Sequence, residues 1–323
     1  MKALVTGAAG FIGSHLTELL LEQGFHVRAF VRYNSRDSWG WLERIEGDVE
    51  IFRGDIRDYD SVREAVSHVD VIFHLAALIS IPYSYRTPQG YIKTNVEGTN
   101  NILDAALRSN RIVKFVHIST SEVYGTAKYT PIDENHPYNP QSPYAATKAA
   151  ADMLSLSYYR SFDLPVTVVR PFNTFGPRQS LRAVIPTIIS QFIVNEGQIT
   201  IGNTTTKRDF LYVKDTARGI FKVGLADNTT GEVVNIGTGK SFSIADVISI
   251  IEEISGIPAR VEVDRSRFRP EKSEVYVLEC DNSKAKKLTG WEPVYDLKSG
   301  LLETFRWFKE NIGHYKNFGK HNI

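Results

Sequence analysis

The 323-residue sequence predicts an α/β protein built on a doubly wound parallel sheet. Two observations support this fold class. Short apolar runs typical of buried strands alternate with longer helix-like stretches between residues 2 and 119. The first run, residues 2–6, enters a glycine-rich turn, a helix-like stretch over 14–23 and a second strand over 25–30, which together make a βαβ unit. In such sheets, ligands bind at the carboxyl ends of the strands.

Composition and charge narrow the classes of function. A hydrophobic content of 42% and a charged content of 23% are ordinary for a globular chain with one large or two modest domains. The net charge of +1 argues against a nucleic-acid or acidic-membrane partner, and no apolar run is long enough to suggest a membrane span. The N-terminus has no signal-peptide pattern, so we expect a cytoplasmic protein. A single cysteine, Cys280, excludes an internal disulfide and a cysteine-cluster metal site, and we predict no metal site.

The turn after the first strand carries the strongest local signal. Gly7, Gly10 and Gly13 are spaced Gly-x-x-Gly-x-x-Gly, with Phe11 and Ile12 between the last two. Glycines there allow a tight turn and bring backbone N–H groups and a helix N-terminus close to a pyrophosphate. The pattern predicts a dinucleotide site; the alternative is a glycine-rich turn without a ligand.

The residues after the second strand bear on the choice of dinucleotide. Arg32, Asn34, Ser35 and Arg36 come before any carboxylate, which first appears at Asp37. An acidic residue at this point binds a ribose 2′-hydroxyl, whereas arginine suits a 2′-phosphate, so the sequence favours NADP over NAD. Alternatively, these arginines are surface residues or stack on the adenine of NAD.

Further candidates for cofactor binding lie at later strand ends and at the start of one helix. They are Asp55, Ile56, Leu75, Ala76, Ala77 and Asn95. Asp55 is suited to accept from the adenine amino group, although a loop aspartate that forms a turn is an alternative. The small residues after the fourth strand permit close backbone approach to a cofactor. His74, at the end of that strand, is interpreted as structural.

Tyr144 and Lys148 suggest the chemistry. Four residues apart on a helix, they share one face, and the lysine is expected to lower the pKa of the tyrosine so that a phenolate takes a proton from a sugar hydroxyl. By itself the pair is as well explained by a solvated helix face, but the predicted dinucleotide site gives it weight. Thr120, Ser121 and Glu122 follow the fifth strand, at the edge where ligands are expected.

Several motifs occur in one order along the chain. They are Thr6-Gly7-x-x-Gly10-x-x-Gly13, His74-x-Ala76-Ala77, Asn95-Val96-x-Gly98-Thr99, Ser119-Thr120-Ser121-Glu122-Val123-Tyr124-Gly125, Tyr144-x-x-x-Lys148, Arg170-Pro171-Phe172-Asn173-x-x-Gly176-Pro177-Arg178, Arg208-Asp209-Phe210-x-Tyr212-Val213-x-Asp215 and Asn235-Ile236-Gly237. From Lys2 to about Lys309 the chain therefore resembles the extended short-chain dehydrogenase/reductase family of nucleotide-sugar epimerases and dehydratases. The resemblance implies a Rossmann domain over residues 1–171 and about 209–238, with a nucleotide-sugar-binding domain over about 172–208 and 239–323. Within these, residues 180–196 and 209–226 are expected to be helical and residues 233–237 to form a strand.

The resemblance also suggests a reaction. Family 4,6-dehydratases carry an acid pair after the threonine, and the Ser121-Glu122 pair of this chain looks like the variant in GDP-mannose dehydratases. Other stretches look closer to bacterial UDP-N-acetylglucosamine 4,6-dehydratases of legionaminic and pseudaminic type: residues 32–35, 38–42, 81–85 and 171–180. A 4-keto-6-deoxy product, formed without net redox change, is therefore expected. An epimerase, a 5,6-ene-forming dehydratase and a non-catalytic NADP-sensing regulator are the alternatives.

Family roles can be carried over residue by residue. Tyr144 would take the C4 hydroxyl proton, Lys148 would hold the cofactor ribose, and Thr120 (or Ser119) would bind the C4 oxygen. Glu122 would remove the C5 proton and then, once protonated, serve the C6 hydroxyl, because Ser121 is a poor acid.

The resemblance likewise implies how the substrate and a second copy of the chain are bound. Asn173, Arg208 and Arg269 would bind the diphosphate of a UDP-sugar, with Arg182, Arg178 and Arg267 as competing arginines. A homodimer is implied, paired through the helix after Asn95 and the helix that carries Tyr144.

Overall fold

The centre of the molecule is a seven-stranded parallel sheet in the order β10-β6-β5-β4-β1-β2-β3. The computed structural model describes residues 1–33 and 38–315. The strands of this sheet are β1 (Lys2–Thr6), β2 (His26–Arg32), β3 (Val49–Gly54), β4 (Val71–His74), β5 (Lys114–Ile118), β6 (Val166–Pro171) and β10 (Val233–Ile236). The order reverses between β1 and β4, so a crevice for ligands is expected at their carboxyl ends. The predicted doubly wound fold is confirmed.

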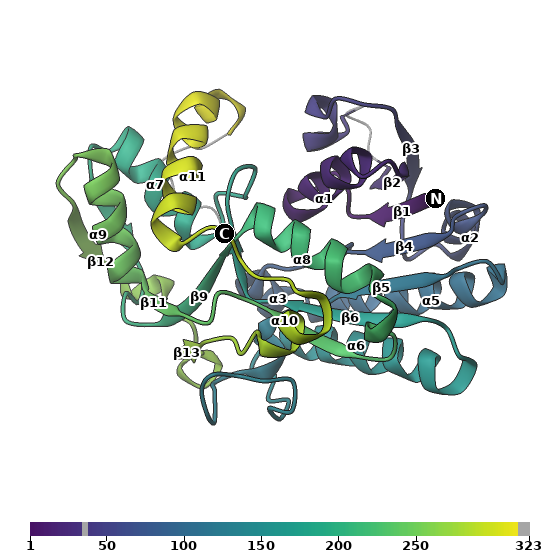
Figure 1. Cartoon of the computed structure of the whole chain (residues 1–323). Coiled ribbons are helices and arrows are strands. Elements are labelled where there is room, and N and C mark those ends of the chain that lie inside the picture. The colour runs from purple at the N-terminus through teal and green to yellow at the C-terminus, as the bar shows by residue number, and fades with distance from the viewer. Residues whose placement is uncertain (34–37, 316–323) are drawn as a thin grey trace.

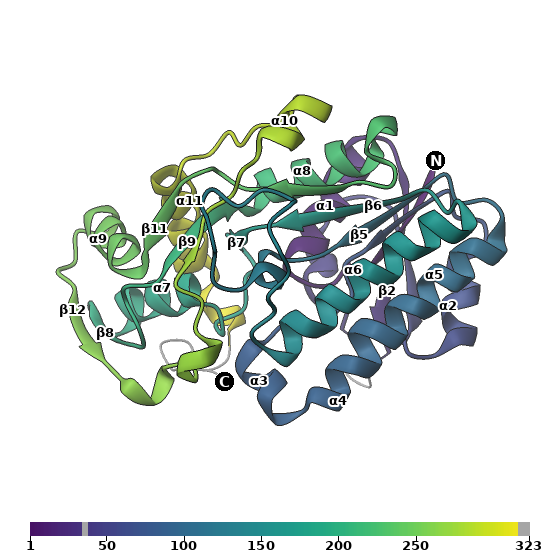
Figure 2. The ribbon, with the colours of Figure 1, turned by 90° about the horizontal axis from the view of Figure 1, so that it is seen from below.

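Helices cover both faces of the sheet, as Figures 1 and 2 show. One face carries α1 (Phe11–Glu22), α8 (Val213–Leu225) and α10 (Ser283–Thr289), and the other carries α2 (Tyr59–Val66), α5 (Gly98–Ser109) and α6 (Pro143–Phe162). Successive side chains of a strand point to opposite faces, so Ala3 and Val5 pack toward α1 and α8, whereas Leu4 packs toward α2 and α5. This two-sided burial explains why the strands read as continuous apolar runs.

A second lobe lies at the left of Figure 1. Its strands and helices are β7 (Asn173–Phe175), α7 (Val184–Val194), β8 (Gln198–Ile201), β9 (Lys207–Tyr212), β11 (Ser241–Ser243), α9 (Ile244–Ser255), β12 (Arg260–Val263), β13 (Val277–Leu278) and α11 (Leu297–Asn311). Strand β9 pairs with β7, β11 and β13, while β8 pairs with β12. The lobe has its own core, in which Phe192, Ile248 and Leu301 are buried. The chain crosses between the lobes, because β10 returns to the seven-stranded sheet after β9 has paired in the second lobe.

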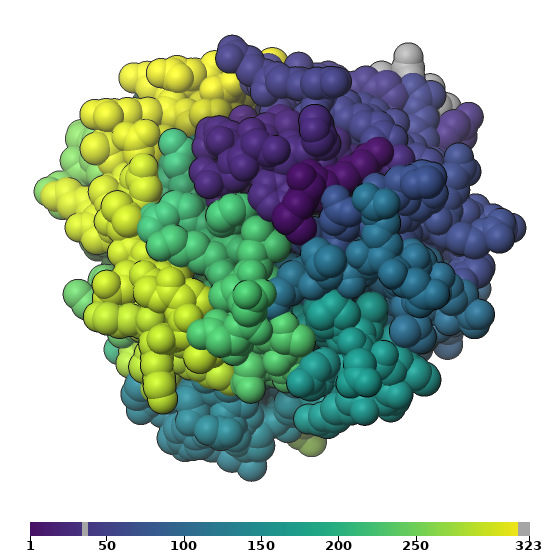
Figure 3. All heavy atoms as spheres, turned by 45° about the vertical axis from the view of Figure 1, so that its right-hand side comes forward, coloured from purple at the N-terminus to yellow at the C-terminus, as the bar shows by residue number. Residues whose placement is uncertain are grey.

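Shorter helical turns connect these elements. They are η1 (Gly40–Arg44), α3 (Ile81–Arg86), α4 (Pro88–Tyr91), η2 (Ile92–Glu97), η3 (Ser121–Tyr124), η4 (Asp227–Thr229), η5 (Arg265–Arg267), η6 (Glu271–Ser273) and η7 (Ile312–His314). Figure 3 shows the surface where the N-terminal segment (purple) meets the segment around α8 (green), with the C-terminal segment (yellow) beside them.

The structure corrects three local expectations. The helix expected over 209–226 begins only at Val213, because residues 207–212 form β9 with a buried run from Arg208 to Tyr212. The helix expected over 180–196 spans Val184–Val194, with Pro186 in its first turn, where a missing N–H is tolerated. The α-helix expected to begin at Asn95 begins instead at Gly98, the first residue of α5. Asn95 itself lies in the preceding π-helical segment, Ile92–Glu97.

Candidate active site

The site lies at the carboxyl ends of β1, β4 and β5, where the loops after these strands meet the first turns of α1 and α6. Helix α6 begins here for local reasons: the Ser142 hydroxyl accepts from the backbone N–H of Ala145 at 3.1 Å, and Pro143 occupies the first turn. This cap places Tyr144 in the first turn of α6 and Lys148 one turn further along.

The glycine-rich turn has the shape that a dinucleotide requires. Gly7 has φ +73°, and a Cβ there would lie 3.0 Å from the backbone nitrogen of Ala76. A Cβ on Gly13 would lie 2.2 Å from the Gly7 carbonyl oxygen. Gly10 caps α1 without a side-chain hydrogen bond, and Phe11 and Ile12 form the first turn, whose N–H groups suit an anion. These residues fit a pyrophosphate.

The candidates for the adenosine end of the cofactor are held by ion pairs. The Asp55 carboxylate accepts from Arg57 Nε at 2.9 Å and from Arg57 Nη2 at 2.6 Å, and Arg32 Nε lies 3.9 Å from it. The Arg57 hydrogen bond is the main reason why the pKa of Asp55 is lowered. Ile56 is buried against Gly98. Asn34 and Ser35 lie outside the described residues.

The candidates after β4 are tied to the fold. The backbone N–H groups of Leu75 and Ala76 both donate to Thr6 Oγ1 at 3.1 Å, and Ala77 follows in the same loop. The Asn95 side chain accepts from the Leu78 N–H at 2.8 Å. Its amide group also donates to the hydroxyl of Thr147 on α6 at 3.1 Å. Asn95 therefore joins this loop to α6 through its side chain.

His74 is fully enclosed. Its two ring nitrogens lie 2.8 Å from Thr6 Oγ1 and 3.0 Å from Thr99 Oγ1. Burial, with smaller effects of His117 and Lys148, lowers its pKa well below the usual value, so the ring is neutral. These contacts agree with a structural role.

Tyr144 and Lys148 are both buried, but their electrostatics differ from the expectation. Burial raises the pKa of Tyr144, and the hydrogen bond with Thr120 opposes that rise. Lys148 Nζ donates to the Ile118 carbonyl at 2.7 Å, and burial lowers its pKa to about 8. The expected lowering of the tyrosine pKa by Lys148 is therefore wrong for the protein alone, because desolvation of the phenol outweighs the effects that favour a phenolate.

A buried ionic network lies behind Lys148, and sequence reasoning missed it. Asp152, one turn further along α6, accepts from Arg170 Nε at 3.0 Å and lies 3.3 Å from His117 Nε2. Arg170 Nη1 donates to the hydroxyl of Tyr124 at 2.7 Å, which links α6 to the turn η3 that carries Glu122. Asp152 continues the Tyr144–Lys148 face at the same spacing, and Arg170 is a charged residue in strand β6, whose other residues are valine, threonine and proline; both were available signals.

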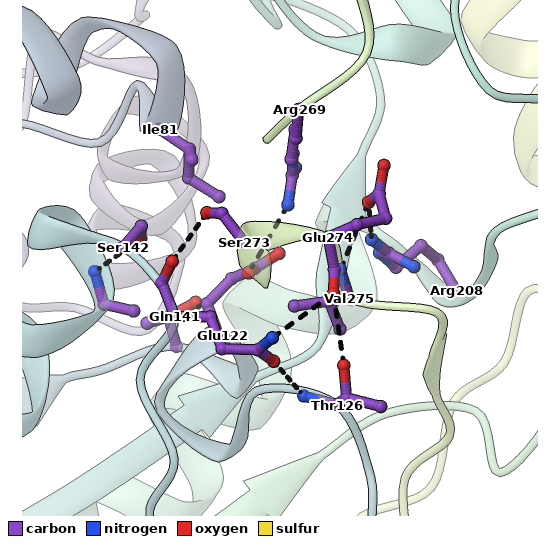
Figure 4. A network of polar contacts seen from close by, with 12 residues as sticks. Ile81, Glu122, Thr126, Gln141, Ser142, Arg208, Arg269, Ser273, Glu274 and Val275 are labelled. Carbon is purple, nitrogen blue, oxygen red and sulfur yellow. Dashed lines mark hydrogen bonds and ion pairs between the residues drawn. The ribbon is translucent and has the colours of Figure 1, made fainter. Parts of the chain in front are cut away.

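Glu122 lies in a cluster of charged side chains, drawn in Figure 4. Its carboxylate is largely buried, and Arg269 Nη1 lies 3.8 Å from its Oε2. Beside this pair, Arg208 Nη2 lies 3.9 Å from Glu274 Oε1. Ser121, the neighbour of Glu122 in η3, is also buried.

Gln141 anchors the segment that carries Arg269 and Glu274 to the catalytic loops (Figure 4). Its Nε2 donates to the Lys272 carbonyl at 2.9 Å, and its Oε1 accepts from the Thr126 N–H at 2.5 Å. The Ser273 hydroxyl donates to the Gln141 carbonyl at 2.6 Å. Neither Gln141 nor Glu274 was identified from sequence, because contacts such as Gln141 with Lys272 and Glu274 with Arg208 join segments that are far apart along the chain.

The other candidates for substrate binding are dispersed. Asn173 begins β7, and its buried Oδ1 has no hydrogen-bond partner within the described chain. Arg182 is exposed. Arg178 pairs with Glu18 at 2.6 Å and Arg267 with Asp264 at 3.0 Å, so these two competitors are engaged elsewhere.

Residues 1–33 and 38–315 contain neither a cluster of metal ligands nor a membrane-spanning helix. No group of three or more histidine, cysteine, aspartate or glutamate side chains there is arranged to hold a metal ion. In the same ranges, no helix is both long and apolar enough to cross a membrane.

A dinucleotide turn on a doubly wound sheet, with a threonine after β5 and a tyrosine and a lysine on the adjoining helix α6, defines an enzyme of the extended short-chain dehydrogenase/reductase class. Residues 4–304 match the family model described as GDP-mannose 4,6 dehydratase, and the chain belongs to this family.

Relatives narrow the class to nucleotide-sugar enzymes. The dTDP-glucose 4,6-dehydratase of Streptomyces antibioticus is 34% identical over 96% of this chain and 93% of its own. The UDP-glucuronic acid 4-epimerase of Bacillus cereus, solved with UDP-glucuronic acid and NAD, is 34% identical with a TM-score of 0.88, over 96% of this chain and 100% of its own. The dTDP-glucose 4,6-dehydratase DesIV of Streptomyces venezuelae, solved with NAD, is 29% identical with a TM-score of 0.89, over 98% and 100%.

Proposed function

We propose that the protein is a nucleotide-sugar 4,6-dehydratase that acts on UDP-N-acetylglucosamine. The observation that carries the reaction type is the position of Glu122: a buried carboxylate at the carboxyl end of β5, next to the Thr120–Tyr144 hydrogen bond and facing Arg269. A carboxylate there is suited to remove the proton beside a newly formed ketone. The choice of UDP-N-acetylglucosamine rests on the sequence resemblance.

The dinucleotide, held by the turn Gly7–Gly13, the loop Leu75–Ala77 and Lys148, would supply the hydride acceptor for C4 and return that hydride at C6. Its oxidised nicotinamide also carries a positive charge, which favours the phenolate form of Tyr144.

Each residue then has a defined task. Tyr144 takes the proton from the C4 hydroxyl, and Thr120 stabilises the charge that develops on the C4 oxygen. Glu122 removes the C5 proton, which the C4 ketone has made acidic. The same proton, now on Glu122, passes to the departing C6 hydroxyl as water leaves. Ser121 is a poor acid at its ordinary pKa, so one carboxyl group serves both steps.

The cofactor preference is a separate proposal. Arg32 in the sequence favours NADP, because arginine suits a 2′-phosphate, and the preference for NADP stays a prediction. Two observations support NAD: similar structures were solved with NAD, and Arg32 lies 3.9 Å from Asp55, whose negative charge opposes a 2′-phosphate. Releasing the bound dinucleotide by heat and separating NAD from NADP chromatographically tests this choice.

One experiment tests the reaction. Purified enzyme is incubated with UDP-N-acetylglucosamine in deuterated water, and the product is followed by mass spectrometry and NMR. Dehydration predicts loss of one water from the sugar, deuterium at C5 and no net reduction of the dinucleotide. Recovery of an isomer with an intact skeleton would contradict dehydration and favour the epimerase alternative.

The epimerase alternative has specific support. Ser121 stands where many dehydratases carry a second acid, and the Bacillus cereus 4-epimerase is 34% identical over nearly the whole chain. Parallel incubation with UDP-glucuronic acid separates the two functions, because an epimerase predicts inversion at C4 with the carboxylate retained. A non-catalytic sensor predicts that neither substrate is converted.

We also propose that the protein works as a cytoplasmic homodimer. Helices α5 and α6 lie side by side on one face of the sheet (Figure 2), and Met153 is exposed on α6. Sedimentation equilibrium tests the dimer, and substitution of Met153 by lysine should favour the monomer.

A further inference from the structure

Four charged side chains face one another at the centre of Figure 4 without close hydrogen bonds. Glu122 and Arg269 are 3.8 Å apart, and Arg208 and Glu274 are 3.9 Å apart. Charge-assisted N–H···O bonds are usually about 2.7–2.9 Å, so both pairs are loose. Arg269 Nη1 is buried and has no hydrogen-bond partner among the described residues. Arg208 Nη1 donates to the Lys207 carbonyl at 2.9 Å, whereas Arg208 Nη2 and Arg269 Nη1 face carboxylates only at the longer distances, which suits these two nitrogens to bind an oxyanion between them.

The two carboxylates in this cluster are held differently. Glu274 Oε1 also accepts from the Val275 N–H at 3.2 Å. This hydrogen bond to Glu274 would remain if Arg208 moved away to bind a ligand. In the described chain, no hydrogen bond reaches the Glu122 carboxylate, and its ion-pair partner is Arg269. The other charged or titratable groups that act on Glu122 are Arg208 from β9 and Tyr144 from α6. Loss of Arg269 would therefore change the surroundings of Glu122 more than loss of Arg208 would change those of Glu274.

We propose that Arg269 is a positioning residue that changes partner when the substrate binds. It holds the Glu122 carboxylate in the free enzyme and passes to the substrate diphosphate, which releases Glu122 to act as the base at C5. The inference rests on the proposed function, because it requires a nucleotide diphosphate at Arg208 and Arg269. It goes further by coupling nucleotide binding to the reactivity of the catalytic carboxylate.

The direction of the effect follows from electrostatics. A neighbouring cation lowers the affinity of a carboxylate for protons, and its removal raises that affinity. The bound diphosphate, which is negative, acts in the same direction. Nucleotide binding should therefore be coupled to proton uptake, and the affinity for the nucleotide sugar should increase as the pH is lowered.

Calorimetry on the full-length chain tests the exchange. Tyr144→Phe enzyme is titrated with UDP-N-acetylglucosamine at mildly acidic pH in two buffers of different ionisation enthalpy, so that binding occurs without turnover. The sugar nucleotide is used instead of UDP because the terminal phosphate of UDP titrates in the same range. We expect proton uptake on binding, which a further Glu122→Gln substitution abolishes and Glu274→Gln preserves.

Two arginine variants form a matched pair. Both Arg269→Gln and Arg208→Gln should weaken nucleotide binding, because each removes a phosphate contact. Arg269→Gln should also reduce proton uptake sharply, since Glu122 has lost its neighbouring cation before the ligand arrives, whereas Arg208→Gln should retain most of it. Equal proton uptake in the two variants would overturn the exchange.

The outcomes separate this inference from the proposed function. Tight binding without proton uptake, or uptake that persists in Glu122→Gln, overturns the exchange alone. If the folded enzyme binds no nucleotide sugar, both the exchange and the proposed substrate class fall. A second measurement needs no cluster variant: in the wild-type enzyme the acidic limb of kcat should lie at higher pH than that of kcat/KM, and coincident limbs would contradict the exchange.

Discussion

On the α6 side of the site, Lys148, Asp152 and Arg170 are buried and joined to their partners by contacts of 2.7, 3.0 and 2.7 Å. On the opposite side, Glu122 and Arg208 face their partners at 3.8 and 3.9 Å. The first side is joined by close hydrogen bonds within the protein, whereas the second leaves guanidinium groups that a ligand could engage. Under the proposed function, the groups for hydride transfer are preorganised, while the group for the C5 proton is arranged by the substrate.

The largest effect is expected at Tyr144. Tyr144→Phe removes the proposed proton acceptor for the C4 hydroxyl, so turnover should fall by about 10²- to 10⁴-fold while nucleotide binding is retained. Steady-state assays and calorimetry measure the two quantities. If turnover were to survive the change, the assignment of hydride transfer to the α6 side would fail.

Asp152→Asn tests whether the α6 side is held by its buried charges. Burial opposes ionisation of Asp152, but Arg170 and His117 together keep its pKa below the usual value. Breaking the pair leaves Arg170 buried without its counter-charge, so the free energy of unfolding should fall by about 3–5 kcal/mol. Urea denaturation measures this loss, and Glu274→Gln on the looser side serves as a control that should cost much less.

The pKa of Asp152 also gives a prediction for acid stability. Because its folded pKa is depressed, its stabilising contribution is present above the unfolded pKa of about 4 and is lost as the pH falls through the folded value. In the wild-type protein the melting temperature should therefore fall in acid more steeply than in Asp152→Asn. Thermal melts of both proteins over a pH series measure the difference, and parallel curves would contradict it.

The lowered pKa of Lys148 leads to a prediction for enzyme activity at alkaline pH. Burial lowers its pKa to about 8, so its ammonium group is present below pH 8 and is lost as the pH rises. If the charge is needed, kcat/KM should fall by about tenfold per pH unit above that value. A pH–rate profile measures this limb, and a flat profile well above pH 8 would show that the charge is dispensable.

The smallest effect is expected at Arg182. This residue is exposed, in contrast to buried Arg208. Arg182→Ala should change kcat/KM by less than about twofold, because solvated charges contribute little. A large rise in KM would contradict this prediction and support the sequence-based assignment of Arg182 to the substrate site.

Much of the architecture was accessible from sequence because it depends on local patterns. The apolar runs, their alternation with helices and the spacing of Gly7, Gly10 and Gly13 predicted the parallel sheet and the turn after β1. The expectation for residues 209–226 was wrong at its start, because the run Asp209 to Tyr212 pairs with β7 and β11, and that pairing depends on distant residues.

The sequence by itself determined the fold class, the family, the presence of Tyr144 and Lys148 on one helix and that of Glu122 after a strand end. The tertiary structure decided how these groups are charged and held: burial raises the pKa of Tyr144, Asp152 lies behind Lys148, and Gln141 holds the segment that brings Arg269 to Glu122. The physical reason is that desolvation and ion pairing depend on which distant segments meet in space. Spacing along a helix or strand records only neighbours on the same element.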